Sequence, residues 1–492
     1  MRKTIIAIAL LLAVSANAQN RLQQRIGSIV KQNPALSGAA VGISIKDMQG
    51  KPIAEYNAAT RLTPASNTKL ITTGAALHTL GADYRFKTSI GYTGTIEDGT
   101  LKGDLYIVGG GDPTVGWASG PDVPPAHFQN WQLILDKAGI RSIEGRIIGD
   151  SRLWEGYLEF GDWTYEDIGT YYGTGADALC FYENTIDLEV AAGAEINSPV
   201  QAVQAYPETP WMHFANLGIT GPEGTGNSLY LYTTDLAPYA ELRGTFALDR
   251  APKTEHFANK FGALTCAWYF RNHLNNNGIT VTGGAADIDR GGYIRTEGFV
   301  LQEKAGEPTL IGAGQSERLS EIARQTNLDS DNFFAEAIFR TMGEEASGHA
   351  VYDSARVAEI SALKKLGLNP GRVTIMDGSG LSRRNAISAG FFADFLVSMA
   401  SSPSFDAFLN TLPTPGEGTL VTLLKGKPAA TRFRLKSGSM EGVLCYSGYL
   451  LDGSGTPVAT VSILVNGASA STSRLRKALE AVLSAISEEI PE

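Results

Sequence analysis

Apolar positions near both ends of the chain form short runs of strand length, accompanied by segments with helical spacing. The strand-like runs are residues 39–45, 52–56, 443–451 and 458–465. Apolar residues recur at helical spacing over residues 20–33, 67–80 and 475–486. This mixture of strands and helices predicts an α/β layer that is built from both ends of the chain.

The middle of the chain has a different pattern. From about residue 85 to residue 285, short apolar or alternating runs such as 104–108 and 228–232 are split by glycine and asparagine. No repeat stands out at the spacing of a solenoid or propeller unit. The middle therefore reads as β-rich structure in one or two subdomains.

Helical spacing returns near residues 258–277 and again over 317–343. We therefore predict an α/β domain formed by residues 19–84 and 286–492. A β-rich insertion over residues 85–285 interrupts it.

The first 18 residues have three features of a secretory signal peptide. Arg2 and Lys3 are positive, residues 5–14 are apolar, and residues 16–18 (Ala-Asn-Ala) offer the small side chains that a signal peptidase needs. The apolar run is about half of the ~20 residues that span a bilayer, so a membrane anchor fits less well. We expect cleavage after residue 18, export to the periplasm, and no integral membrane segment in the mature chain.

Charge and composition limit the partners, cofactors and disulfides that this chain can have. The formal net charge is −10, and removing Arg2 and Lys3 makes it −12. An acidic chain without a basic cluster argues against nucleic acid as a partner. The six histidines are scattered without a His-x-x-His pair, so we expect no metal and no other cofactor. One disulfide at most can form among the three cysteines, Cys180, Cys266 and Cys445.

Ser66 and Lys69 form a Ser-x-x-Lys pair at the start of a predicted helix. Residues three apart share a helix face, so the amine can approach the hydroxyl. A serine hydroxyl is a weak nucleophile until a base takes its proton, and a lysine can be that base when burial lowers its pKa. Backbone N–H groups of the first helical turn also favour negative charge near Ser66.

Two later motifs complete a set. Ser330-Asp331-Asn332 offers a hydroxyl and an amide, and Lys436-Ser437-Gly438 precedes the last two strands. The glycine lets a substrate lie close to the strand, and this is the only Lys-[Ser/Thr]-Gly of the chain. Ser-x-x-Lys, Ser-x-Asn and Lys-[Ser/Thr]-Gly in this order are the motifs of penicillin-recognising serine enzymes.

Other segments compete for these roles. The Ser-x-x-Lys pairs Ser28–Lys31 and Ser361–Lys364 lie inside predicted helices, and we interpret them as solvated surface pairs. The segment 182–184 (Tyr-Glu-Asn) could replace Ser330-Asp331-Asn332, but it lies in the insertion and is interpreted as a strand end.

With these motifs, the chain resembles the low-molecular-mass class C penicillin-binding proteins, the penicillin-binding protein 4 type of DD-carboxypeptidase and DD-endopeptidase. The long insertion is distinctive, since 264 residues separate Ser66 from Ser330. Residues 109–113, 377–383 and 412–420 also match. Ser437 departs from the family pattern, in which threonine is more usual, but it keeps the hydroxyl.

The resemblance implies an α/β fold with a penicillin-recognising, transpeptidase-like domain, in which helices flank an antiparallel sheet. It implies a serine-type D-Ala-D-Ala carboxypeptidase, and also an endopeptidase, that acts on peptidoglycan peptides and is inhibited covalently by β-lactam antibiotics. The reaction proceeds through an acyl-enzyme on Ser66, with Lys69 as base and the N–H groups of Ser66 and Ser439 as the oxyanion hole.

The resemblance also implies roles for the remaining site residues. Ser330 and Lys436 relay a proton to the departing amine, and Asn332 holds the substrate amide. The terminal carboxylate is bound by Ser437 at the Gly438 strand, with help from Arg383. In the insertion, Asp167 and Tyr172 fall where relatives receive the side chain of the diamino acid.

Two alternatives stay open. A β-lactamase is disfavoured by the insertion and by the absence of a Glu-x-x-x-Asn between Asn332 and Lys436. A non-catalytic wall-binding protein could keep the same fold, but all three motifs retain reactive side chains.

Overall fold

The computed structural model of the protein describes residues 21–491, so the predicted signal peptide lies outside the described residues. Two compact units are formed. The first contains the described residues up to Tyr84, together with Leu319–Met342 and the residues from Ala355 onward. The second contains Arg85–Arg318 and Gly343–Ser354.

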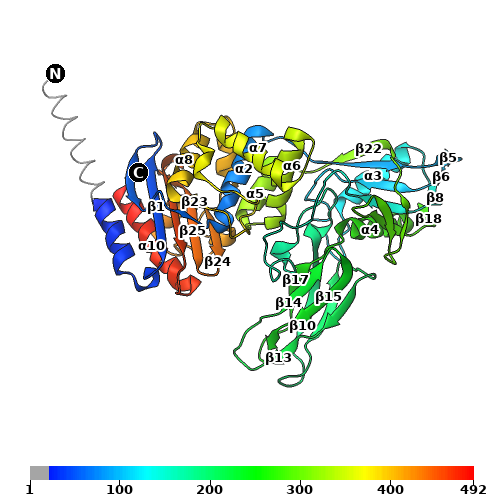
Figure 1. Cartoon of the computed structure of the whole chain (residues 1–492), viewed down its shortest axis with the longest axis horizontal. Helices are drawn as coiled ribbons and strands as arrows, with labels where there is room; N and C mark the ends of the chain where they lie inside the picture. The colour runs from blue at the N-terminus through cyan, green and yellow to red at the C-terminus, as the bar shows by residue number, and fades with distance from the viewer. Residues whose placement is uncertain (1–20, 492) are drawn as a thin grey trace. The chain divides into compact units, whose positions relative to one another are not determined.

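A five-stranded antiparallel sheet is the centre of the first unit (Figure 1). Its strand order is β2-β1-β26-β25-β24. The N-terminal strand β1 pairs along its full length with the C-terminal strand β26, so that Ile43 lies opposite Ile463. The strands are β1 (Ala40–Asp47), β2 (Pro52–Tyr56), β24 (Phe433–Met440), β25 (Val443–Leu451) and β26 (Pro457–Asn466).

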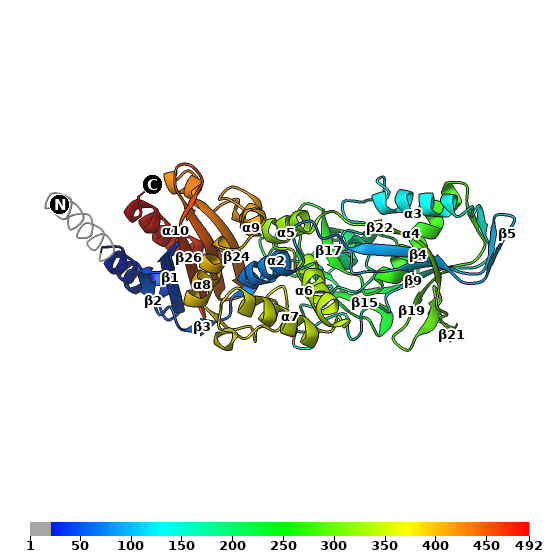
Figure 2. The same ribbon diagram turned by 90° about the horizontal axis from the view of Figure 1, so that it is seen from above.

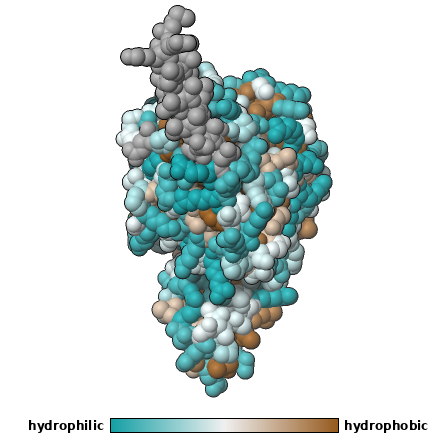
Figure 3. Space-filling view, turned by 90° about the vertical axis from the view of Figure 1, so that its left-hand side faces the viewer, coloured by the Kyte–Doolittle hydropathy of each residue, from teal (hydrophilic) through white to brown (hydrophobic). Residues whose placement is uncertain are grey.

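Helices cover this sheet on both faces, which is why its strands are nearly continuous apolar runs. On one face, α10 (Thr472–Glu489) packs with the helix over residues 21–32. Buried Ile26 and Val482 belong to the same core cluster as Ile463 of the sheet. The outer surface of this helical layer is largely hydrophilic (Figure 3).

The other face is covered by α8 (Ala389–Ala400), which contacts β1, β25 and β26. Next to it lies α2 (Thr68–Thr79), a helix buried on almost every side. A helix that is buried all round belongs to the interior of a helical layer. The further helices are α5 (Leu319–Leu328), α6 (Asn332–Ser347), α7 (Tyr352–Lys365) and α9 (Phe405–Thr411).

The apolar pattern over 317–343 continues without interruption, but the structure divides it into α5 and α6. Ser330 lies between them with a φ of 63°, in the left-handed region that ends a helix. Asp331 then begins the next helix, because its Oδ1 accepts a hydrogen bond from the Phe334 N–H at 2.9 Å. The break exposes the Ser-Asp-Asn residues at a helix junction.

The second unit contains a mixed seven-stranded sheet of order β21-β20-β19-β9-β7-β4-β22 (Figure 2). Its central strands β7, β9 and β19 are parallel, and α4 (Gly262–Asn276) packs on β9 and β19. The sequence pattern did not indicate α3 (Ala126–Lys137), which packs on β22. The strands are β4 (Lys87–Tyr92), β7 (Leu105–Val108), β9 (Ile147–Asp150), β19 (Ala285–Ile288), β20 (Tyr293–Thr296), β21 (Leu301–Lys304) and β22 (Thr309–Gln315).

Smaller sheets complete the second unit, and one group of them encloses a separate apolar core around Phe246 and Leu188. Its strands are β10 (Thr185–Ala191), β11 (Gln201–Tyr206), β12 (His213–Asn216), β13 (Ile219–Gly221), β14 (Tyr230–Thr234), β15 (Ala237–Arg243), β16 (Thr245–Ala247) and β17 (Lys253–Ala258). A four-stranded sheet contains β5 (Thr95–Glu97), β6 (Thr100–Lys102), β8 (Ser142–Ile143) and β18 (Thr280–Val281).

The three cysteines are buried free thiols. Over residues 21–491, no helix has both the length and the apolar character that a bilayer-spanning segment needs.

Candidate active site

Ser66 lies in a tight turn ahead of a buried helix. The 3-10 turn η2 (Ala65–Asn67) leads directly into α2. Ala65 has a φ of 47°, in a left-handed region that costs a non-glycine residue about 1–3 kcal/mol. Gly380 packs closely on this strained residue. A Cβ atom at position 380 would lie only 2.0 Å from the Ala65 carbonyl oxygen. The turn that presents the half-buried Ser66 is thus fixed by a neighbouring loop.

Buried polar side chains tie the same turn to the sheet. The Asn67 side-chain amide donates to Ser447 Oγ at 2.8 Å, and Ser447 shares a hydrogen bond of 2.8 Å with Ser462. All three residues are fully buried. Ser447 and Ser462 are cross-strand partners on β25 and β26, so the serine turn rests on the middle of the sheet.

Lys69 connects three segments that are far apart in the sequence. Its Nζ donates to Ser66 Oγ at 2.9 Å, to Asn332 Oδ1 at 2.6 Å and to the Ser379 carbonyl oxygen at 2.7 Å. The side chain is fully buried. The helix spacing that places the amine beside the hydroxyl is therefore realised, and all three donor positions of the amine are used.

Burial lowers the pKa of Lys69 to about 8, against the opposing charges of Asp331, Glu336 and Asp377. Removing an ammonium group from water disfavours its charged form. A minor fraction of the amine is therefore neutral near neutral pH, and this neutral form can accept a proton from a neighbouring hydroxyl.

Lys436 brings the third motif to the second one. Its Nζ donates to Ser330 Oγ and to the Ser437 carbonyl oxygen, both at 2.8 Å. Burial, followed by repulsion from Lys69, lowers the pKa of Lys436 well below its usual value. Two buried amines thus lie on either side of a serine and an asparagine from the α5–α6 junction.

One edge of the sheet remains open next to this cluster. β24 is the last strand in the sheet order. The Leu435 N–H donates to the Pro413 carbonyl oxygen at 3.0 Å, on the side away from β25. Because the direction of backbone groups alternates along a strand, the N–H and C=O groups of Ser437 and Ser439 also face the open edge. An extended peptide can pair with an edge of this kind.

Gly438 allows β24 to lie directly against the serine turn. A Cβ atom at this position would be 2.6 Å from the Pro64 carbonyl oxygen, 2.8 Å from the Asn67 nitrogen and 3.0 Å from the Ser66 nitrogen. These contacts are with backbone atoms, which cannot move aside as a flexible side chain can. The glycine of the Lys-Ser-Gly motif is thus needed for close packing of protein on protein, besides the substrate approach expected from the sequence.

The loop over residues 377–383, which the sequence matches to the family, is held in place by two carboxylates. The Asp377 carboxylate accepts from the Gly380 N–H at 2.9 Å and from the Ser382 N–H at 2.6 Å. Glu336 of α6 accepts from the Ser379 N–H at 2.7 Å, which orients the Ser379 carbonyl toward Lys69. Burial, together with the charge of Asp377, raises the pKa of Glu336 to about 8.

Two residues near the site had no role predicted from the sequence, although Thr419 lies in the matching segment 412–420. Glu336 follows Asn332 by one helical turn, and only the fold brings it beneath the loop. Thr419 of the turn η6 (Gly418–Leu420) accepts a hydrogen bond from Ser437 Oγ at 2.8 Å. Thr419 therefore orients the hydroxyl that is predicted to bind a carboxylate.

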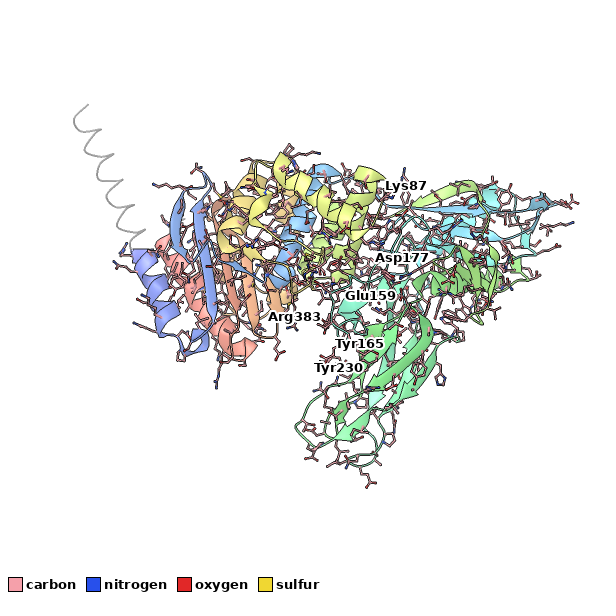
Figure 4. All side chains as sticks on the ribbon, viewed as in Figure 1. Lys87, Glu159, Tyr165, Asp177, Tyr230 and Arg383 are labelled. Carbon is pink, nitrogen blue, oxygen red and sulfur yellow. The ribbon has the colours of Figure 1, made fainter. Side chains whose placement is uncertain are left out.

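Arg383 is exposed, and its side chain forms no hydrogen bond or ion pair with another described residue (labelled in Figure 4). Its carbonyl oxygen accepts from Thr63 Oγ1 at 3.4 Å, so its backbone lies beside the segment that leads to Ser66. The other two Ser-x-x-Lys pairs, Ser28–Lys31 and Ser361–Lys364, are exposed on helices.

Asp167 and Tyr172 lie in the second unit and contact each other. The Tyr172 hydroxyl donates to Asp167 Oδ1 at 3.3 Å, and Thr164 Oγ1 donates to Asp167 Oδ2 at 2.7 Å. Burial, followed by the charge of Asp167, raises the pKa of Tyr172 to about 12. The segment 182–184 also belongs to the second unit, where it is a left-handed turn, and the Asn184 amide donates to the Gly175 carbonyl oxygen.

Comparison with known proteins identifies a family for this arrangement. A model of the D-Ala-D-Ala carboxypeptidase 3 (S13) family matches residues 22–486. The D-alanyl-D-alanine carboxypeptidase of Actinomadura sp. (strain R39) is 29% identical over 470 residues, or 91% of this chain and 82% of that protein. The D-alanyl-D-alanine carboxypeptidase DacB of Haemophilus influenzae is 24% identical over 482 residues, or 93% and 91%.

The fold also has a solved counterpart. The crystal structure of penicillin binding protein 4 (dacB) from Haemophilus influenzae matches with a TM-score of 0.78 at 21% identity, covering 95% of this chain and 99% of that one. The predicted α/β, penicillin-recognising fold is confirmed by this likeness. The roles of individual residues and the domain boundaries stay predictions.

The pKa of Lys69 sets an expected pH profile. We expect the rate of penicillin acylation to rise with pH, by about tenfold per unit below pH 8, and to level off above it, because only the neutral amine accepts the proton. The measurement is the second-order acylation rate from pH 5.5 to about 9.5, with circular dichroism as the control for folding. A rate that is flat across this range would remove Lys69 from the role of base.

Gly438→Ala tests the packing of β24 on the serine turn. The new Cβ atom meets backbone at 2.6 Å, so the turn must shift, and displacement on this scale lowers the acylation rate by about 10²-fold. Gly27→Ala is the matched control, since nothing lies within 4 Å of its added Cβ atom. Labelling of Gly438→Ala at the wild-type rate would show that the close approach is dispensable.

Proposed function

The chain belongs to the D-Ala-D-Ala carboxypeptidase 3 (S13) family, and from this premise we propose how its own residues perform the reaction. The family prediction made from the three motifs is confirmed, and the protein is a serine-type D-alanyl-D-alanine carboxypeptidase. One observation carries the proposed mechanism: the buried Lys69 amine lies 2.9 Å from Ser66 Oγ and also binds Asn332.

In the first step, Ser66 Oγ attacks the carbonyl carbon of the penultimate D-alanine while its proton moves to the neutral Lys69 amine. The new C–O bond forms as the carbonyl electron pair moves onto oxygen. The backbone N–H groups of Ser66 and Ser439 stabilise this oxyanion.

The tetrahedral intermediate then loses the terminal D-alanine. The C–N bond breaks, and Ser330 and Lys436 relay the proton held by Lys69 to the departing amine. The contact of 2.8 Å between Lys436 Nζ and Ser330 Oγ supports this relay. Water next attacks the ester with Lys69 again as base, and the proton returns to Ser66 Oγ as the acid product leaves.

The open edge of β24 supports a binding mode for the substrate. An extended peptide would pair with the backbone groups of Ser437 and Ser439, and the Asn332 amide would hold a peptide carbonyl. Ser437 Oγ, oriented by Thr419, would bind the terminal carboxylate with help from Arg383.

The finer features of the function extend this proposal. A peptide cross-link also presents a D-alanyl carbonyl followed by an amine, so the same steps give DD-endopeptidase activity. A β-lactam ring acylates Ser66 by the same attack, and slow hydrolysis of that ester makes it a covalent inhibitor. Export to the periplasm, as the N-terminal residues predict, would bring the enzyme to peptidoglycan.

Asp167 is proposed to read the diamino acid of the stem peptide. Its loop is anchored by buried Lys260, whose Nζ pairs with Glu159 at 2.7 Å and donates to the Gly173 and Thr174 carbonyl oxygens (Glu159 is labelled in Figure 4). A carboxylate on an anchored loop can pair with the side-chain ammonium of a diamino acid.

Ser66→Ala should abolish both peptidase activity and covalent penicillin labelling, by on the order of 10⁴–10⁶-fold, while leaving the fold intact. Ser28→Ala is the matched control, because Ser28 belongs to an exposed Ser-x-x-Lys pair. The measurements are turnover of a D-Ala-D-Ala peptide and gel labelling with a fluorescent penicillin. Labelling that persists in Ser66→Ala would show that another residue is the nucleophile.

Asp167→Ala should weaken turnover of peptides with a free side-chain amine and leave penicillin acylation nearly unchanged, because penicillin lacks the diamino acid. A pair of this kind costs about 2–5 kcal/mol to truncate. Glu166→Ala, at the exposed neighbouring carboxylate, is the control. If both rates of Asp167→Ala fall together, Asp167 supports the loop through Thr164 and Tyr172 and does not read the substrate.

A further inference from the structure

The second unit contains a cavity of about 810 Å³ that the mechanism does not use. Helices α3 and α4, the loop over residues 120–125 and the end of β11 line it. Figures 1 and 2 both show α3 and α4 next to each other. Its volume lies within the ~300–1,000 Å³ that is usual for small-molecule sites.

Aromatic rings form one wall of the cavity. Trp268 and Tyr269 of α4 are only partly buried, and their rings meet edge to face at 4.9 Å. Tyr269 also stacks on buried Phe181 at 5.1 Å, and its hydroxyl accepts from the Glu208 N–H at 2.7 Å. The wall is therefore a rigid aromatic surface that the protein itself does not cover completely.

Side-chain amides at helical spacing form another part of the lining. Gln129 and Gln132 come from α3, and Asn272 and Asn276 come from α4. Gln132 is held in place by His273 Nε2, 3.0 Å from its Oε1. Gln129 and Asn276 are exposed, and their side chains form no hydrogen bond with another described residue. Their donors and acceptors are available to a ligand.

The charge of the cavity argues against anionic polymers as ligands. None of the described residues that line it is lysine or arginine, and Asp122, Asp136 and Glu208 are acidic. Burial lowers the pKa of His273, so its imidazole is neutral at neutral pH. Phosphate-rich or carboxylate-rich polymers are repelled, whereas a neutral ligand with many hydrogen-bonding groups is accepted.

We propose that this cavity binds N-acetylated sugar units, and that its natural ligand is the glycan strand of peptidoglycan. The C–H face of a pyranose ring packs on Trp268 and Tyr269, while its hydroxyl and acetamido groups bond to the glutamine and asparagine amides. The choice of this glycan rests on the proposed function, but the sugar chemistry rests on the cavity alone. The second unit then binds the strand from which stem peptides extend.

The test is titration of the whole chain with a neutral oligomer of N-acetylglucosamine, followed by calorimetry and tryptophan fluorescence. Saturable binding is expected in the wild type and at least about tenfold weaker binding in Trp268→Ala. Gln129→Ala and Asn276→Ala should each weaken binding by about three- to tenfold, as expected for one hydrogen bond. Because both amides are exposed, their loss should leave the fold intact. These two variants therefore test sugar binding if Trp268→Ala does not fold. Tyr239→Ala, at an exposed ring outside the cavity, should bind like the wild type.

Turnover of a sugar-free D-Ala-D-Ala peptide separates this proposal from the proposed function. That rate should be unchanged in Trp268→Ala, whereas release of D-alanine from intact peptidoglycan should fall. If the wild type does not turn over the sugar-free peptide, the proposed function is wrong. The oligosaccharide titration alone then decides whether the cavity binds sugar. No saturable oligosaccharide binding, or equal binding in every variant, overturns the proposal. So does a cationic peptide that competes for the cavity more tightly than the sugar, or self-association of the chain through this face.

Discussion

The buried amine of Lys69 needs hydrogen-bond acceptors, and the first unit is built so that three of its segments supply them. Lys69 is removed from water, so its N–H groups need acceptors inside the protein. The acceptors come from η2, from the start of α6 and from the loop after Met376, and they meet only if all three are held in place. Each has its own support: Gly380 packs on the serine turn, Asp331 begins α6, and Glu336 binds the loop. The position of Ser66 and the fold around it therefore depend on the same contacts.

Several elements of the first unit were predictable because they follow a local rule, whereas no residue range was predicted for β24, α7, α8 or α9. Strands β1, β25 and β26 appear as apolar runs, and the spacing of Ser66 and Lys69 follows from helix geometry. The break at Ser330 was missed because the apolar spacing of α5 continues in phase into α6. The motif there contained a helix-capping aspartate, the signal that could have located it. In α3, Phe128, Trp131 and Leu135 have helical spacing, but the β-like pattern of the surrounding segment concealed it.

What could not be predicted depends on contacts across the fold. Glu336 has no motif of its own, and its importance arises from a loop 43 residues later in the chain. Gly438 could be assigned to substrate approach, but its contact with the backbone of the serine turn requires the sheet and α2 to be in place. The open edge of β24 likewise appears only with the strand order, and an unpaired edge is otherwise a liability that proteins cover. Here a peptide substrate would occupy it.

The pairing of β1 with β26 determines when this enzyme can become active during synthesis. Ile43 meets Ile463, a partner 420 residues later. β1 can pair with β2 early, but its other edge waits until almost the whole chain is available. Contacts of such long range form slowly, and a chain made from its N-terminus folds early segments first. The second unit has its own cores and is complete in sequence before β24 is made. Ser66 is thus synthesised early, while Lys436, its proposed partner in the reaction, arrives with the last strands. A shortened chain that ends before β24 lacks the strand that we propose for binding the substrate and the oxyanion.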